Sequence, residues 1–201
     1  MITAYTGLPG AGKTLMMIRK MLKERFWAKV YRCEKDLIQI TNFPVNEKLL
    51  PGVIQINNNE IKKLYTWILT KKNYGASIYL DEASILFPAM DYKNIPKDVI
   101  IALRQHRHAG YQLYYTAQSL DDVAKGLRTI SQYVYEISGW SLLRFSTFKC
   151  FGVKHGKANY KDKYDKGILL HTKKLYSSYD TENNIDTPDY LDLKSPQNED
   201  E

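Results

Sequence analysis

The chain has 201 residues, 44% of them apolar, a length and composition typical of one globular domain with a buried core. No apolar run approaches the roughly 18 residues that span a bilayer, and no basic-then-apolar segment opens the chain, so we expect a soluble, cytosolic protein rather than a membrane-spanning or secreted one. The net charge is +7, and residues 1–178 carry 28 basic but only 14 acidic side chains. This excess favours a polyanionic partner such as nucleic acid or an anionic membrane, although a lysine-rich solvated surface would give the same count.

The first predicted elements are a strand, a glycine-rich loop and a helix. Residues 1–6 are short, β-prone and half apolar. Residues 7–14 read Gly-Leu-Pro-Gly-Ala-Gly-Lys-Thr, a complete G-x-x-x-x-G-K-[ST] phosphate-binding loop. Between Thr14 and Lys29, apolar residues recur at roughly helical spacing, namely Leu15, Met16, Ile18, Met21, Leu22 and Phe26. A strand before the loop and a helix behind it form the context that this motif requires.

The loop residues predict a binding site for ATP and Mg²⁺. Glycines let successive backbone N–H groups point at phosphate oxygens, and the positive end of the following helix favours the same anion. Lys13 is placed to reach the β- and γ-phosphates, and Thr14 to ligate Mg²⁺. The predicted nucleotide-binding residues are therefore Gly7, Leu8, Pro9, Gly10, Ala11, Gly12, Lys13 and Thr14.

Two short strands and a helix are expected next. Residues 35–42 alternate apolar and polar side chains and end in an Asn-Phe-Pro turn, and residues 53–56 form a third strand. A helix is expected from Glu60 to about Leu69. The two cysteines, Cys33 and Cys150, fit no ligand spacing, so we expect free buried thiols rather than a disulfide.

The fourth strand carries the second half of the predicted site. Residues 76–80 are apolar and are followed by Asp81 and Glu82, a Walker B pattern. Ligands of open α/β sheets collect where parallel strands end, so this acidic pair should lie beside the glycine loop. We expect Asp81 to hold Mg²⁺ together with Thr14, and Glu82 to polarise the water that attacks the γ-phosphate.

A helix is predicted from Lys97 to about His108, and it should stop at Ala109-Gly110. Its Arg104 and Arg107, with Arg128 further on, are candidates for an arginine that acts on a neighbouring subunit's site, although each could be an ordinary surface residue. His106 and His108 are two residues apart and face different ways on a helix, so surface histidines are favoured over a metal site.

Residues 111–117 form the fifth predicted strand, and Gln118 should lie at its end beside the Walker B strand. There it could sense the γ-phosphate, or it could be a strand-end amide satisfied by the backbone. A helix from Leu120 to about Ile130 and a strand over residues 133–137 complete the expected core.

Residues 142–170 interleave aromatic and basic side chains, which favours a β-hairpin at the edge of the core. Such a surface suits nucleic acid, but it also fits an amphipathic edge sheet with one buried face, the interpretation we favour. The predicted division is residues 1–140 for the core, 141–180 for a basic, β-rich extension of the same domain and 181–201 for an acidic, disordered tail.

These motifs, in this order, resemble the N-terminal cytoplasmic domain of the zonula occludens toxin-like (Zot) family. That family includes the assembly ATPases of filamentous bacteriophages, within the FtsK–HerA group of P-loop motors. The resemblance covers nearly the whole chain and adds these stretches to the glycine loop: Thr41 to Pro44, Leu80 to Ala83, Arg104 to Gly110, Thr116 to Gln118, Leu120 to Asp122, Leu127-Arg128 and Lys174 to Thr181. It implies a three-layer α/β P-loop fold with a mostly parallel sheet.

The resemblance also implies a function. ATP hydrolysis would power the assembly and extrusion of a single-stranded-DNA phage, by a ring-like homo-oligomer, expected to be a hexamer, in the host cytoplasm at the inner membrane. Family members commonly continue into a membrane span that is not present here, which leaves open a truncated chain, a membrane-anchored partner, or a relative that packages DNA into a capsid. A nucleotide-dependent scaffold or a toxin-like effector is the alternative of another class, and the intact Walker residues argue against the toxin.

Overall fold

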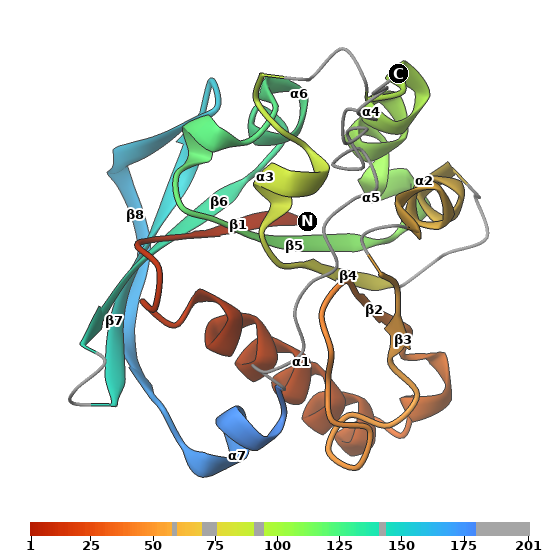
Figure 1. Cartoon of the computed structure of the whole chain (residues 1–201), viewed down its shortest axis with the longest axis vertical. Coiled ribbons are helices and arrows are strands. Elements are labelled where there is room, and N and C mark those ends of the chain that lie inside the picture. The colour runs from red at the N-terminus through yellow and green to blue at the C-terminus, as the bar shows by residue number, and fades with distance from the viewer. Residues whose placement is uncertain (58–59, 70–75, 91–94, 141–143, 180–201) are drawn as a thin grey trace, which may run out of the picture.

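The computed structural model describes residues 1–57, 60–69, 76–90, 95–140 and 144–179. One eight-stranded sheet runs through the molecule in the order β3-β2-β4-β5-β1-β6-β7-β8, and helices cover both of its faces (Figure 1). The strands are β1 (Ile2–Thr6), β2 (Gln39–Thr41), β3 (Ile54–Gln55), β4 (Ser77–Leu80), β5 (Gln112–Ala117), β6 (Tyr133–Trp140), β7 (Phe145–Lys154) and β8 (Lys157–Leu170). The helices are α1 (Lys13–Val30), α2 (Ile61–Leu69), α3 (Ala83–Leu86), α4 (Lys97–Arg104), α5 (His106–Ala109), α6 (Lys125–Arg128) and α7 (Lys173–Ser177).

The sheet has a parallel part and an antiparallel part. Every pairing among β1 to β6 is parallel, whereas β7 pairs antiparallel with both β6 and β8. All residues of β1 and β4 are buried, as expected for strands covered on both faces. The predicted three-layer α/β fold with a mostly parallel sheet is thus confirmed, and the basic hairpin continues that same sheet at its edge.

Two apolar clusters fill the space between the layers. On one face, α1 and α7 pack through Met17, Met21 and Leu175 against Tyr5 and Phe148 of the sheet. On the other face, helices α2 to α6 cover Ile2, Ala4, Ile78 and Leu113. Figure 1 shows α1 and α7 on one side of the strands and α3 to α6 on the other.

A half-buried carboxylate, Glu24, fixes α1 on the sheet. The Tyr79 hydroxyl donates to Glu24 at 2.6 Å, the amide of Gln39 donates to it at 3.2 Å, and Lys20 forms an ion pair with it at 3.4 Å. Burial and the nearby Glu24 charge raise the pKa of Tyr79 well above its usual value, so the phenol stays protonated and keeps donating. Because α1 begins at the glycine loop, this anchor also fixes that loop.

Two predicted helices are shorter in the structure than in the sequence pattern. The helix expected over residues 97–108 breaks at Gln105, where Tyr111 Oη donates to Ala102 O at 3.0 Å and His106 Nδ1 lies 2.9 Å from Leu103 O. These side chains occupy carbonyls that would otherwise continue the helix. His106 is therefore buried, not on the surface, whereas His108 is exposed as expected.

The helix expected over residues 120–130 is also interrupted. A capping box at Ser119 starts a 3₁₀ turn at Leu120–Asp122, and a bridge between Pro88 and Val123 then extends the chain before α6. In the second predicted strand, residues Glu34–Asp36 form a 3₁₀ turn, and only Gln39–Thr41 pair in the sheet.

The end of α1 also departs from the sequence pattern. Beyond Met21 only Ala28 is buried, and Phe26 is 60% exposed although its spacing placed it on the apolar face. Both cysteines are free as expected, but Cys33 is exposed and only Cys150 is buried. Within the described ranges, no helix is long and apolar enough to cross a membrane. The predicted tail, residues 181–201, lies outside them.

Candidate nucleotide-binding site

The glycine loop lies at the carboxyl edge of the parallel strands, between β1 and α1. The Gly7 N–H donates to Gln118 O at 3.2 Å, which joins the ends of β1 and β5. Because β4 pairs with β5 in parallel, Asp81 and Glu82 come to the same edge. The structure therefore brings the predicted loop residues, the acidic pair and Gln118 together, as parallel strand ends predict.

A short chain of hydrogen bonds links the loop to the Walker B strand. Thr14 Oγ1 donates to Asp81 Oδ2 at 2.9 Å, and Thr116 Oγ1 donates to Asp81 Oδ1 at 2.5 Å. Asp81 is only 5% exposed, and no basic side chain forms a described ion pair with it. A carboxylate and a hydroxyl oxygen side by side are hard oxygen donors of the kind that Mg²⁺ prefers, so these residues fit that ion.

The backbone at Asp81 is held from both sides by residues outside the glycine loop and the Asp-Glu pair. Asn42, just after β2, accepts from Asp81 N–H at 2.6 Å and donates to Asp81 O at 2.9 Å. Thr116 Oγ1 also accepts from Glu82 N–H at 2.8 Å. Sequence reasoning assigned neither residue a part in the site. Both lie at the ends of strands flanking β4 and within stretches of the family resemblance, and these two signals together could have indicated them.

Burial dominates the electrostatics of this pair. It raises the pKa of Asp81 above the usual 3.8, against the opposing hydrogen bonds from Thr116, Thr14 and the Glu82 backbone and the charge of Lys13. Burial likewise lowers the pKa of Lys13, while Asp81 and Glu82 oppose that shift. A buried carboxylate with a raised pKa gains from a cation placed beside it.

Lys13 spans the mouth of the loop. Its Nζ donates to Gly7 O at 2.9 Å and to Leu8 O at 3.0 Å. Gly10 and Gly12 have φ of 73° and 92°, in the left-handed region that favours glycine. The ammonium group thus lies inside the curve of the loop, where it could contact a bound phosphate.

Glu82 is aimed out of the sheet by its own backbone. Its φ of 48° and ψ of 52° are left-handed, an uncommon state for a glutamate, and it forms the N-cap of α3. The side chain is exposed, directly after buried Asp81. This turn separates the two carboxylates, so that one faces Thr14 and the other faces solvent.

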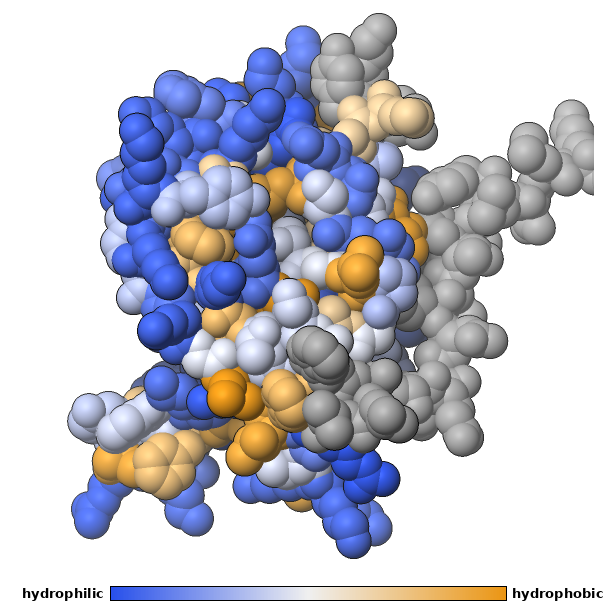
Figure 2. All heavy atoms as spheres, turned by 90° about the vertical axis from the view of Figure 1, so that its left-hand side faces the viewer, coloured by the Kyte–Doolittle hydropathy of each residue, from blue (hydrophilic) through white to orange (hydrophobic). Residues whose placement is uncertain are grey.

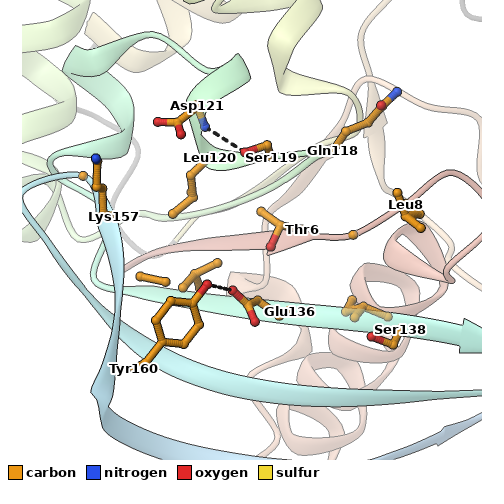
Figure 3. Close-up of a pocket in the computed structure, with 15 residues that line it drawn as sticks. Thr6, Leu8, Gln118, Ser119, Leu120, Asp121, Glu136, Ser138, Lys157 and Tyr160 are labelled. Carbon is orange, nitrogen blue, oxygen red and sulfur yellow. Dashed lines mark hydrogen bonds between the residues drawn. The ribbon is translucent and has the colours of Figure 1, made fainter.

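A cavity of about 480 Å³ opens beside the loop on the face of the sheet opposite α1. It is lined by Thr6 to Leu8, Gln118 to Asp121, residues of β6 and the start of β8. Figure 3 shows Gln118 at its rim near Leu8, with Glu136 and Tyr160 across the floor. The Tyr160 hydroxyl donates to Glu136 at 2.7 Å. Gln118 therefore lies both beside the loop and at the rim of the cavity.

The other side of the loop packs tightly on β6. A Cβ on Gly139 would lie 2.6 Å from Ala11 Cα, and one on Gly7 would lie 2.2 Å from Ile137 O. Both distances are shorter than carbon atoms tolerate, so only glycine fits. No motif indicates Gly139, because its partner is 128 positions away in the sequence.

The three candidate arginines do not gather at this edge. Arg128 on α6 forms an ion pair with Asp121, a cavity residue of the same chain. Arg104 and Arg107 are exposed on α4 and α5, which lead into the start of β5 at the amino edge of the strands. Those two are thus remote from their own chain's loop.

The antiparallel edge presents a basic surface. Along β8, Lys157, Lys161, Lys163 and Lys166 are exposed, and so are Tyr160 and Tyr164. Figure 2 looks onto this side of the molecule and shows many hydrophilic residues on it, with apolar residues at the lower end and also in the middle of the face. Tyr164 packs edge-on against Tyr133, and Tyr160 against Phe151, so the aromatic rings also brace the hairpin.

Comparison with known proteins places the chain in a family. The zonular occludens toxin (Zot) family model matches residues 1–182. The structure is similar to the N-terminal domain of zonular occludens toxin from Neisseria meningitidis, with a TM-score of 0.68 and 22% identity over 89% of this chain and 98% of that one.

More distant matches share the fold. The DNA-packaging ATPase B204 of Sulfolobus turreted icosahedral virus has a TM-score of 0.54 and 14% identity over 79% of this chain and 95% of that one. The genome packaging NTPase B204 of Sulfolobus turreted icosahedral virus 2, in complex with ATP-gammaS, has a TM-score of 0.50 and 15% identity over 79% and 94%. No curated protein matches the sequence. The fold is that of P-loop NTPases, and the match over residues 1–182 shows that this chain belongs to the Zot family.

Proposed function

We propose that the protein is a Mg²⁺-dependent ATPase. The contact of 2.9 Å between Thr14 and Asp81 carries the proposal, because it joins the glycine loop to the Walker B strand through two oxygen ligands of the type that Mg²⁺ takes. A glycine turn with a purely structural part would not need that pairing.

Each part of the proposed ATP hydrolysis can be assigned to a residue of this chain. Lys13 and the loop N–H groups would bind the phosphates, and Thr14 and Asp81 would hold Mg²⁺, which when bound would neutralise phosphate charge. Glu82 takes the proton of the attacking water. Its carboxylate is exposed to solvent next to the buried Asp81, so a water molecule can reach it. Gln118 orients that water or senses the γ-phosphate from the rim of the cavity.

We propose further that ATP hydrolysis drives assembly and extrusion of a single-stranded-DNA filamentous phage at the cytoplasmic face of the inner membrane, in a homo-oligomeric ring. Membership of the Zot family supports this proposal, as does the fold shared with proteins named as DNA- and genome-packaging ATPases. The lysines of β8 offer a surface for DNA. One arginine would act on the neighbouring subunit's site, and Arg104 and Arg107 at the opposite edge suit a head-to-tail ring better than Arg128 does.

Mixing two inactive variants tests the ring and the arginine together. We expect Glu82→Gln and the relevant arginine-to-alanine variant each to lack turnover, and their mixture to recover about a quarter of wild-type activity, the share of interfaces with both residues intact. Arg104→Ala, Arg107→Ala and Arg128→Ala are each mixed in turn, with and without single-stranded DNA.

Specific activity that does not change on dilution, with no recovery in any mixture, would contradict the ring. Stimulation by DNA without a membrane partner would favour packaging into a capsid over extrusion. A Lys13→Ala variant that still supports virion production would favour a scaffold instead.

A further inference from the structure

A buried hydrogen-bond relay supports the glycine loop from the antiparallel part of the sheet. Ser146 of β7, which is 0% exposed, donates from Oγ to Ala11 O at 2.6 Å. His171, at the end of β8, has Nε2 2.6 Å from the same Oγ, and its Nδ1 lies 3.1 Å from the Tyr176 hydroxyl. None of these three residues belongs to the Walker motifs.

The chemistry of the partners fixes the direction of the relay. Ala11 O can only accept, so the single Ser146 proton goes to it, and Ser146 Oγ must accept from His171 Nε2–H. In a neutral imidazole Nδ1 then accepts, and Tyr176 donates to it. Burial lowers the pKa of His171, which favours this neutral form.

The relay acts on a peptide that the phosphate must meet. A trans peptide points its C=O and the next N–H in opposite directions, so holding Ala11 O on β7 turns the Gly12 N–H away from β7. Gly12 is pressed against the relay, since a Cβ there would lie 2.7 Å from Ser146 Oγ and 3.0 Å from His171 Nε2. The peptide therefore has little room to flip.

The relay is carried by a segment that also touches the other side of the site. After His171, α7 leads to Ser178, whose carbonyl accepts from Asn46 N–H at 3.2 Å, while Ser177 O accepts from the Asn46 side chain at 2.9 Å. Asn46 lies four residues after Asn42, which holds the Asp81 backbone. Residues 171–179 thus join the supports of both Walker elements.

We propose that Ser146, His171 and Tyr176 are positioning residues that keep the Gly12 N–H directed at the bound phosphates. The inference rests on the proposed function, and it adds three residues from outside the motifs to the phosphate site. If the proposal is right, the affinity for ATP should depend on whether residue 171 can donate a hydrogen bond to Ser146.

Titration calorimetry of the full chain with ATP and Mg²⁺ tests the relay, alongside thermal melting. Ser146→Ala and His171→Ala should each raise the Kd for ATP about tenfold, the usual effect of losing one buried hydrogen bond. His171→Gln places an amide donor near the position of Nε2 and should restore most of the affinity. Tyr176→Phe removes only the last hydroxyl and should raise the Kd about two- to threefold. His155→Asn, at an exposed histidine of the β7–β8 turn, is the control and should match wild type.

The outcomes separate this inference from the proposed function. If the wild type itself does not bind ATP, the proposed function fails. If the wild type binds ATP, and Ser146→Ala and His171→Ala melt lower but bind with unchanged Kd, the residues are structural only and the relay is overturned. Equal Kd values for His171→Gln and His171→Ala would also overturn it, because the donor would then not matter.

Discussion

The parallel and antiparallel parts of the sheet use polar residues in opposite ways. At the ends of β2, β4 and β5, Asn42, Asp81 and Thr116 are buried and hydrogen-bonded to one another. Along β8, a strand of 14 residues at the edge of the sheet, the lysines are exposed and lie between Lys157 and Lys166. The first arrangement gathers oxygen atoms that would suit one small cation, whereas the second would suit a long, repetitive anion.

The parallel and antiparallel parts of the sheet meet at β6 and β7, and residues of both strands contact the glycine loop. Gly139 on β6 and Ser146 on β7 pack against the glycine loop, so the site is bounded on one side by the antiparallel hairpin. The hairpin is therefore part of the support of the loop as well as an exposed surface. Substitutions on either side of the junction should separate these two uses.

Among substitutions that probe this comparison, the largest effect on ATP affinity should come from adding a side chain at that junction. Gly139→Ala places a Cβ 2.6 Å from Ala11 Cα, so the loop must shift, which should cost about 1–3 kcal/mol of stability and lower ATP affinity more than tenfold. Gly52→Ala is the matched control: it has room for a Cβ but a φ of +69°, so it should cost about 1 kcal/mol with unchanged ATP binding. If calorimetry gave Gly139→Ala and Gly52→Ala the same affinity for ATP, β6 would not support the loop.

Replacing the buried carboxylate of Asp81 should raise stability but impair function. Because burial raises the pKa of Asp81, its contribution to stability is greatest below the unfolded value of 3.8 and is lost as pH rises through the folded value. At neutral pH the buried, ionised Asp81 destabilises the folded protein. Asp81→Asn should therefore raise the melting temperature of the nucleotide-free protein by roughly 2–4 °C.

The same variant should lose the Mg²⁺ dependence of ATP binding, since Asn supplies no charge to the ion. Melting near pH 3.8 and at pH 8 without nucleotide checks the sign, and the gain over wild type should be larger at pH 8. A lower melting temperature at both values would show that the hydrogen bonds from Thr14 and Thr116 outweigh the burial of the charge.

The smallest effect on ATP should come from the exposed lysines. Replacing Lys161, Lys163 and Lys166 by Gln should leave ATP turnover without DNA unchanged, because none of them lines the cavity or the loop. The slope of log K for single-stranded DNA against log salt should fall by about 2, or about 0.7 for each phosphate that a lysine no longer neutralises. A salt slope equal to that of the wild type would assign DNA binding to another surface, and Lys23→Gln plus Lys62→Gln, at exposed positions of α1 and α2, would be the control.

The sequence predicts the parallel part of the site well because its signals are local. The glycine loop fixes its own strand and helix, and the acidic pair after an apolar strand predicts the same edge as Gln118. Thr14 and Asp81 meet as expected. The residue roles assigned to Glu82, Gln118 and the arginines stay predictions.

The rest depends on interactions between distant parts of the chain. Gly139, Ser146 and His171 reach the loop across more than a hundred positions, and no spacing rule links them to it. The helix expected over residues 97–108 breaks because Tyr111 and His106 occupy its carbonyls, an interaction that periodicity does not show. Phe26 follows the helical period of α1 but lies past Met21, where burial almost ends.

The most direct test of ATP hydrolysis at this edge is binding and turnover in Glu82→Gln, measured alongside the wild type. The amide keeps the size of the side chain at the exposed, left-handed position but cannot take a proton from water. We expect turnover to fall by about 10²–10⁴-fold while the Kd for ATP stays within about threefold of wild type. Turnover equal to wild type would contradict the proposed mechanism, because the carboxylate placed at the edge by the Walker B strand would then have no part in hydrolysis.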